Sequence, residues 1–85
     1  MSDLQKRFEE ASAAVKKLEE DPGNDVKLQL YALYKQGSEG DVAGKRPGFT
    51  DMIGRAKYDA WAKTKGMTKD EAMKKYVALV KSLTA

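Results

Sequence analysis

The sequence predicts an all-α protein, an up-down-down-up four-helix bundle. Three observations predict it. Apolar residues recur every three or four positions in four separate segments, as they do on one face of a helix. Glycine, proline and capping residues separate these segments. The connections differ in length, and their lengths restrict the directions in which successive helices can run.

The first two expected helices lie on either side of Pro22-Gly23. The first spans about residues 3–19, and its apolar stripe consists of Leu4, Phe8, Ala11, Val15 and Leu18. The second spans about residues 25–36, with Asn24 as the expected N-cap and Gly37 as the expected C-terminal stop. Each helix therefore has an apolar face and recognisable ends.

The last two expected helices follow a longer connection. The third spans about residues 51–65, begins after a cap at Thr50 and ends at Gly66. Thr68 and Glu71 have the spacing of a capping box, so a fourth helix is expected from there nearly to the C-terminus.

The connections predict the directions of the helices. The turns at 20–24 and 66–67 are short, so the helices on either side of each turn are expected to be antiparallel. Segment 38–49 extends to roughly 40 Å, whereas the second helix is only about 20 Å long. This segment can return the chain along the bundle, so the second and third helices are expected to be parallel.

Composition indicates one domain, residues 1–85, without thiol or imidazole chemistry. The 85 residues include no cysteine and no histidine, which excludes disulfides and both Ser-His and Cys-His catalysis. No apolar run approaches the roughly 20 residues that span a bilayer. We therefore expect a cytoplasmic protein that has no metal site, no catalytic residues and no stable membrane insertion.

Charge and aromatic residues point to an anionic ligand. Residues 26–69 hold nine basic and four acidic side chains, a local excess of five. Within them, Tyr31 and Lys35 are four positions apart and Tyr34 flanks the same lysine, so one helical face offers an ammonium and two hydroxyls. Lys57 and Trp61 place a second cation one turn from an aromatic ring. A phosphorylated, planar head group with an apolar tail fits this set.

Other interpretations of these residues stay open at this level. The tyrosines and lysines could instead be amphipathic residues at the edge of a core. A nucleotide or single-stranded nucleic-acid binding module is an alternative, because tyrosines stack on bases and lysines neutralise phosphates. A structural helical adaptor is another. The segment GDVAGKR departs from the phosphate-binding loop in its spacing and lacks a preceding strand.

Three longer sequence segments favour one of these functions. YALYKQGSEGD, KRPGFTDMIGRAKYDAW and GMTKDEAMKKYV together resemble the acyl-CoA-binding protein family, and the resemblance extends from Phe8 through Leu83. It implies the same up-down-down-up bundle and a non-enzymatic carrier of medium- to long-chain acyl-CoA esters. Acyl-CoA-using enzymes would be transient partners, and nucleic acid is not an expected partner.

The resemblance also implies which residues bind the head group. Tyr31 and Lys35, assisted by Tyr34, match residues that contact the adenine and the 3′-phosphate in such proteins. Lys57 matches a lysine that reaches the same phosphate. Lys16, in the first helix, matches a lysine that contacts the head group.

The remaining implied site residues belong to the acyl path or to the fourth helix. Phe8 and Leu28 match residues that line the acyl path, and Tyr76 matches the tyrosine of the fourth helix. Tyr58 stands where the family usually has tryptophan near the acyl chain. A smaller ring with a hydroxyl is expected to alter the groove and the chain-length preference.

Overall fold

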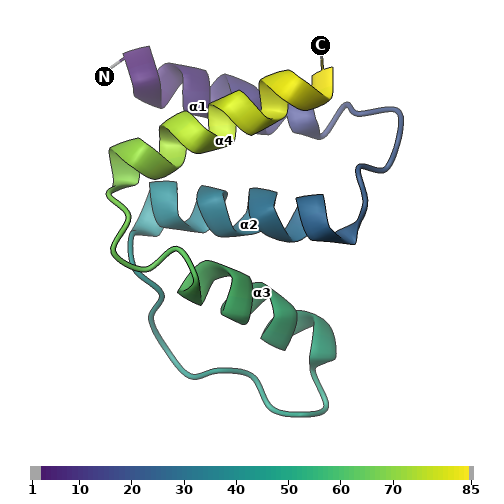
Figure 1. Cartoon of the computed structure of the whole chain (residues 1–85), viewed down its shortest axis with the longest axis vertical. Coiled ribbons are helices and arrows are strands. Elements are labelled where there is room, and N and C mark those ends of the chain that lie inside the picture. The colour runs from purple at the N-terminus through teal and green to yellow at the C-terminus, as the bar shows by residue number, and fades with distance from the viewer. Residues whose placement is uncertain (1–2, 85) are drawn as a thin grey trace.

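The structure is a computed structural model of the chain, and it describes residues 3–84. These residues form four helices and no strand: α1 (Asp3–Val15), α2 (Asn24–Glu39), α3 (Met52–Ala62) and α4 (Lys69–Thr84). Figure 1 shows α1 and α4 running in one direction and α2 and α3 in the other. The predicted all-α fold and its up-down-down-up order are confirmed.

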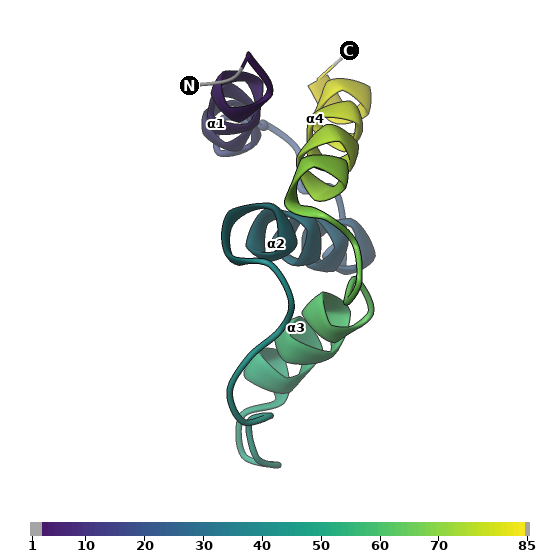
Figure 2. The same ribbon diagram turned by 90° about the vertical axis from the view of Figure 1, so that its left-hand side faces the viewer.

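The four helices are arranged around α2. α4 packs against both α1 and α2, while α3 packs against α2 alone among the major helix pairs. Figure 2 shows α1 and α4 at one end of the molecule, α2 in the middle and α3 at the other end. The molecule is flat, with extents of 37 × 29 × 15 Å. Ligand sites are therefore expected on broad faces and in grooves between helices.

The principal core lies between α1, α2 and α4. It consists of buried side chains from all three helices: Phe8, Ala11, Leu30, Met73, Tyr76 and Val80. From α3, Trp61 is the side chain that becomes buried, and its indole N–H donates to the carbonyl of Gly40 at 2.8 Å. Because α3 contributes so little to this core, its position depends largely on side chains along the α2–α3 boundary.

Three helix ends differ from the prediction. α3 ends at Ala62 rather than near residue 65, and the backbone N–H groups of Thr64 and Lys65 donate to the carbonyls of Trp61 and Ala62 at 3.0 and 3.2 Å. α1 ends at Val15 rather than near residue 19, and the next backbone bonds are tighter turns, Lys17 N–H to the Ala14 carbonyl at 3.0 Å among them. α2 continues through Gly37 and ends before Gly40, which has φ of 90°. Gly37 is a packing residue, because a Cβ there would lie 3.1 Å from atoms of both Phe8 and Met73.

The caps also correct the prediction in part. α2 has Gly23 as its N-cap, without a side-chain hydrogen bond, so Asn24 is the first helical residue. α3 is capped by the carboxylate of Asp51 rather than by Thr50; this carboxylate accepts from the Gly54 N–H at 2.9 Å. The expected cap of α4 is confirmed, since the Thr68 hydroxyl accepts from the backbone N–H three residues later at 3.1 Å.

A buried amide fastens the two loops at one end of α2. Gln36 is fully buried, and its side-chain N–H groups donate to the carboxylate of Asp41 at 2.9 Å and the carbonyl of Met67 at 2.8 Å. Its side-chain oxygen accepts from the Thr64 hydroxyl at 2.9 Å. Asp41 also accepts from the Gly66 N–H at 2.9 Å, and this bond, followed by that from Gln36, lowers the pKa of its carboxyl. The network joins α2 to the chain on either side of α3.

Candidate functional site

The structure places several of the predicted residues around one hollow on α2 and α4. We call it the tyrosine pocket; its volume is about 430 Å³ and it is lined by Leu30, Tyr31, Tyr34, Lys35, Ser38, Glu39 and Tyr76. The spacing of Tyr31 and Lys35 puts both side chains on one face of α2, as predicted from sequence. The tyrosines and Lys35 therefore give the pocket a wall of aromatic rings with hydroxyl groups and one ammonium group.

An aromatic cluster forms the base of this pocket. Phe8 meets Tyr34 and Tyr76 edge to face, with ring centroids 5.3 and 5.1 Å apart. Tyr34 and Tyr76 lie 5.9 Å from each other. Tyr34 is 39% exposed, while Phe8 and Tyr76 are each 3% exposed. Phe8 therefore supports the tyrosines from within the core, and burial raises the pKa of the Tyr76 hydroxyl.

Each of the two lysines predicted for the site places its ammonium over an aromatic ring of the other helix, α2 or α3. Lys57 of α3 has its ammonium 5.4 Å from the ring centre of Tyr31, and Lys35 of α2 has its ammonium 5.1 Å from that of Trp61. The sequence grouped each lysine with aromatic residues of its own helix. The structure exchanges these partners, because the two helices pack side by side with their lysines facing across the boundary. Both ammonium groups thus lie near the α2–α3 junction.

Glu39 is the immediate counterion of Lys35. The two side chains are four positions apart on α2 and form a hydrogen-bonded ion pair. The hydrogen bond to Glu39 raises the pKa of the Lys35 ammonium, so this group stays charged at neutral pH. Its side chain is 30% exposed. An anion that enters the tyrosine pocket therefore meets a charged ammonium that already has a carboxylate partner.

A second hollow continues the site along the start of α2 and α3. This α2–α3 groove has a volume of about 390 Å³ and is lined by Asn24, Lys27, Leu28, Met52, Ile53, Ala56 and Lys57. Leu28, which the sequence assigned to an acyl path, contributes an apolar wall here. Lys57 belongs to this groove and also contacts Tyr31 of the tyrosine pocket. One lysine therefore connects an apolar groove with a polar aromatic one.

Two other predicted residues lie apart from this pair of hollows. Lys16 is exposed just after α1 and lines a separate hollow of about 430 Å³, which adjoins the tyrosine pocket through the shared Leu30. Tyr58 faces the loop before α3, where its hydroxyl donates to the carbonyl of Gly44 at 3.0 Å. The predicted roles of Lys16 in head-group contact and of Tyr58 in chain length stay predictions.

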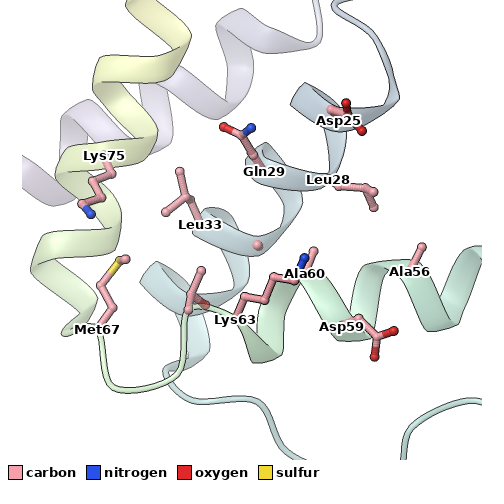
Figure 3. Close-up of a pocket in the computed structure, with 12 residues that line it drawn as sticks. Asp25, Leu28, Gln29, Leu33, Ala56, Asp59, Ala60, Lys63, Met67 and Lys75 are labelled. Carbon is pink, nitrogen blue, oxygen red and sulfur yellow. The ribbon is translucent and has the colours of Figure 1, made fainter.

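A larger hollow adjoins the α2–α3 groove, with which it shares Leu28 and Ala56. Its volume is about 670 Å³, and Figure 3 shows Leu28 and Leu33 on α2, Ala60 on α3, and Lys75 on α4 around it. Of the predicted site residues, Leu28 lines this hollow, whereas the residues of the aromatic cluster do not. Size alone therefore does not identify the site that the sequence predicts.

Trp61 and Glu39 are residues of the site that the sequence predictions gave no role toward Lys35. Glu39 was recognisable, since it lies four positions after that lysine on the same helix. Contact with Trp61 was not recognisable, because it depends on the register between α2 and α3.

The fold and these hollows are typical of a small helical binding module, and comparisons with known proteins identify its family. Residues 5–80 match the family described as Acyl CoA binding protein. The chain belongs to this family, as the three sequence segments quoted above predict.

Relatives and a solved structure agree with this assignment. Acyl-CoA-binding protein homolog 1 of Caenorhabditis elegans is 51% identical over 78 residues, which cover 92% of this chain and 91% of that protein. The crystal structure of Oryza sativa Acyl-CoA-Binding Protein 2 matches with a TM-score of 0.91 and 43% identity, over 95% of this chain and 90% of that one. Enoyl-CoA delta isomerase 2 of Rattus norvegicus is 47% identical over 85 residues, all of this chain but 22% of that protein.

Proposed function

We propose that this chain binds medium- to long-chain acyl-CoA esters and carries them without breaking a bond. The observation that carries the proposal is the pair of crossed lysines. Lys35 and Lys57 come from different helices and place two ammonium groups beside aromatic rings at one junction. A phosphorylated nucleotide needs both features, because the cations meet its phosphates and the rings stack on its base.

The head group would occupy the tyrosine pocket. Lys35 and Lys57 would hold the 3′-phosphate through charge-assisted hydrogen bonds, and Tyr31 would face the adenine. Tyr34, which packs against Phe8 and Tyr76, would assist them. Tyr76 would serve mainly as support, because it is 3% exposed.

The acyl chain would leave the head group along the α2–α3 groove. Leu28 supplies apolar surface there, and Lys57, which lines the groove and lies over the ring of Tyr31, would stand where the groove meets the nucleotide. Each buried methylene contributes about 0.8 kcal/mol, so a long chain can supply much of the affinity while the head group fixes orientation. Phe8 would act on the ligand through the tyrosines that it supports.

We further propose that the chain acts as a monomeric, cofactor-free carrier in the cytoplasm and delivers its ligand to acyl-CoA-using enzymes during brief encounters. The isomerase is a much longer protein, and this chain matches only 22% of it. Its name is therefore not a reason to propose isomerase activity for this chain. Carriage requires only that the thioester be covered and released. The nucleic-acid alternative gains no support from the family or from the fold.

Titration calorimetry with four ligands tests the proposal. Palmitoyl-CoA is expected to bind strongly, free CoA weakly, and free palmitate and single-stranded DNA weakly or not at all. The ranking follows because only the thioester presents both a nucleotide and an apolar chain. Equal binding of DNA and palmitoyl-CoA would favour a nucleic-acid module, and flat traces with all four would refute a carrier role.

A further inference from the structure

The side of α2 that carries Tyr31 and Lys35 begins with a lysine to which the sequence predictions gave no role. Lys27 lies four positions before Tyr31, which in turn lies four positions before Lys35, so the three side chains follow one another along one side of the helix. Four residues of a helix span roughly 6 Å along its axis. A further ammonium therefore lies about one turn of α2 from the site proposed for the head group.

Lys27 also lies where two hollows meet. It lines the α2–α3 groove, and it lines the hollow of about 430 Å³ beside the turn that joins α1 to α2. We call the latter the turn hollow; its charged lining consists of Lys16, Glu20, Asp21 and Lys27. The turn hollow shares Leu30 with the tyrosine pocket. It therefore adjoins both hollows of the proposed site, and Lys27 is the residue that it shares with the α2–α3 groove.

An ion pair holds the ammonium of Lys27 at this boundary. The carboxylate of Asp21 accepts from this ammonium at 2.7 Å and from the backbone N–H of Gly23 at 2.8 Å. The bond from Lys27, followed by that from Gly23, lowers the pKa of the Asp21 carboxyl, so this carboxyl is ionised at neutral pH. The side chains of Lys27 and Asp21 are 52% and 63% exposed. The turn before α2 thus holds an accessible ammonium that keeps further N–H donors for an anion.

The chemistry of the proposed ligand brings a second anion to this place. The ribose of coenzyme A bears the 3′-phosphate, and through its 5′ carbon it bears the diphosphate that leads to pantetheine and the thioester. If Lys35 and Lys57 hold the 3′-phosphate, the diphosphate lies near the same junction. From there the ligand has to continue toward the α2–α3 groove, and Lys27 lines that groove at its border with the turn hollow.

We infer that Lys27 binds the diphosphate of the ligand and makes this chain prefer nucleotide thioesters over thioesters of pantetheine alone. Asp21 would hold the ammonium in the free protein and would share it with the diphosphate in the complex. The inference rests on the proposed function, because it assigns a further part of the same ligand to a cation. A lysine that only covered apolar surface with its stem would contribute equally to every thioester with the same acyl chain, so the two roles can be separated.

Calorimetry of Lys27→Met with three thioesters tests the inference. Methionine keeps an unbranched apolar side chain and removes the ammonium. Palmitoyl-CoA has the 3′-phosphate and the diphosphate, palmitoyl-3′-dephospho-CoA has the diphosphate alone, and palmitoyl-pantetheine has neither. The variant is expected to lose at least about threefold in affinity for each of the first two and to bind the third like wild type, because only the diphosphate loses a partner. Lys74→Met, at an exposed position of α4 outside these hollows, controls for net charge and is expected to lose much less.

Other patterns of loss would overturn the inference. Equal losses for all three thioesters would show that Lys27 acts through packing, and a loss confined to palmitoyl-CoA would assign it to the 3′-phosphate. Equal losses in Lys27→Met and Lys74→Met would show that net charge alone is responsible. A failure of wild type to bind palmitoyl-CoA would refute the carrier function and this inference with it, whereas wild-type binding that Lys27→Met leaves unchanged would refute only the role of Lys27.

Phosphorus NMR of bound palmitoyl-CoA gives a second readout, because the 3′-phosphate and the diphosphate have separate resonances. Lys27→Met is expected to move the diphosphate resonances and to leave that of the 3′-phosphate in place. Lys27→Arg is expected to retain most of the wild-type affinity, since it keeps a cation at this position. Movement of the 3′-phosphate resonance alone in Lys27→Met would contradict the assignment.

Discussion

At the scale of single residues, Lys35 is the central residue of the candidate site. Its ammonium is paired with Glu39, lies over the ring of Trp61 and borders the pocket formed by the tyrosines. These contacts hold a flexible side chain at the α2–α3 junction and keep it charged. A phosphate that binds Lys35 has to share it with Glu39 or displace that carboxylate.

The first prediction therefore concerns Glu39→Gln. Loss of the competing charge should tighten palmitoyl-CoA binding by roughly two- to fivefold, the range expected for a partly exposed ion pair. Calorimetry at low salt measures the effect, and Glu10→Gln, in the exposed part of α1, controls for net charge. Weaker binding in Glu39→Gln would show that the carboxylate orients the lysine for the ligand and does not compete with it.

At the scale of elements, α2 joins the core to the site. One side of it carries Leu30 and Gly37 against α1 and α4, and another carries Lys35 toward α3. The close approach at Gly37 sets how near α2 lies to Phe8 and Met73. A change of volume in this contact therefore acts on the aromatic cluster and on the site above it.

The second prediction follows from that contact. Gly37→Val should lower the free energy of unfolding by about 1–3 kcal/mol, because the added carbons enter a packed contact. Gly48→Val is the matched control, since no atom lies within 4 Å of a Cβ there and its φ is not positive. Urea unfolding measures both variants. Equal stability of Gly37→Val and wild type would mean that α2 moves outward at no cost.

Helix number and direction could be predicted from sequence, while several helix ends could not. Apolar period and turn length are local properties, and they determine the four helices and their order. The role of Gly37 depends on Phe8 and Met73, which are remote in sequence, so the same glycine is read as a stop. Thr50 and Asp51 are neighbouring residues of the capping type, and only the backbone geometry selects Asp51.

The site was predictable to a similar degree. Tyr31 and Lys35 share a face by spacing alone, and the structure confirms that they line one pocket. The contacts of Lys57 with Tyr31 and of Lys35 with Trp61 join α2 and α3. They depend on how the two helices are aligned, which residue spacing within one helix does not determine. The proposed roles of these residues toward a ligand come from the family resemblance and not from spacing.

At the scale of the whole molecule, exposed carboxylates help to hold the chain between helices. Asp59 receives a bidentate contact from Arg46 at 2.8 and 2.7 Å, and Asp41 accepts from Gly66 and from Gln36. The hydrogen bonds from Arg46 lower the pKa of Asp59, as those to Asp41 lower its pKa. The Arg46–Asp59 pair joins the connection before α3 to that helix, and Asp41 joins this connection to α2 and to the turn after α3.

The third prediction is loss of stability in acid. The folded pKa of Asp41 and of Asp59 lies below the ordinary value of 3.8, so folding is favoured by their ionised forms. Their contribution is present above about pH 4 and is lost as the pH falls through the lowered pKa values. Circular-dichroism melts from pH 7 to pH 2 should show this fall.

Asp41→Asn tests one source of that dependence. The variant should melt at a lower temperature than wild type at neutral pH, and the difference should shrink in acid, where the wild-type carboxyl is protonated as well. A constant difference across the whole pH range would show that ionisation of Asp41 contributes nothing to stability.

The most direct measurement of the central claim compares wild type with Lys35→Ala against two ligands, palmitoyl-CoA and its 3′-dephospho analogue. If the ammonium of Lys35 holds the 3′-phosphate, the variant should lose at least about tenfold more affinity for the phosphorylated ligand than for the analogue, as expected for a charge-assisted hydrogen bond. Equal losses for the two ligands would contradict the account, because Lys35 would then not contact that phosphate.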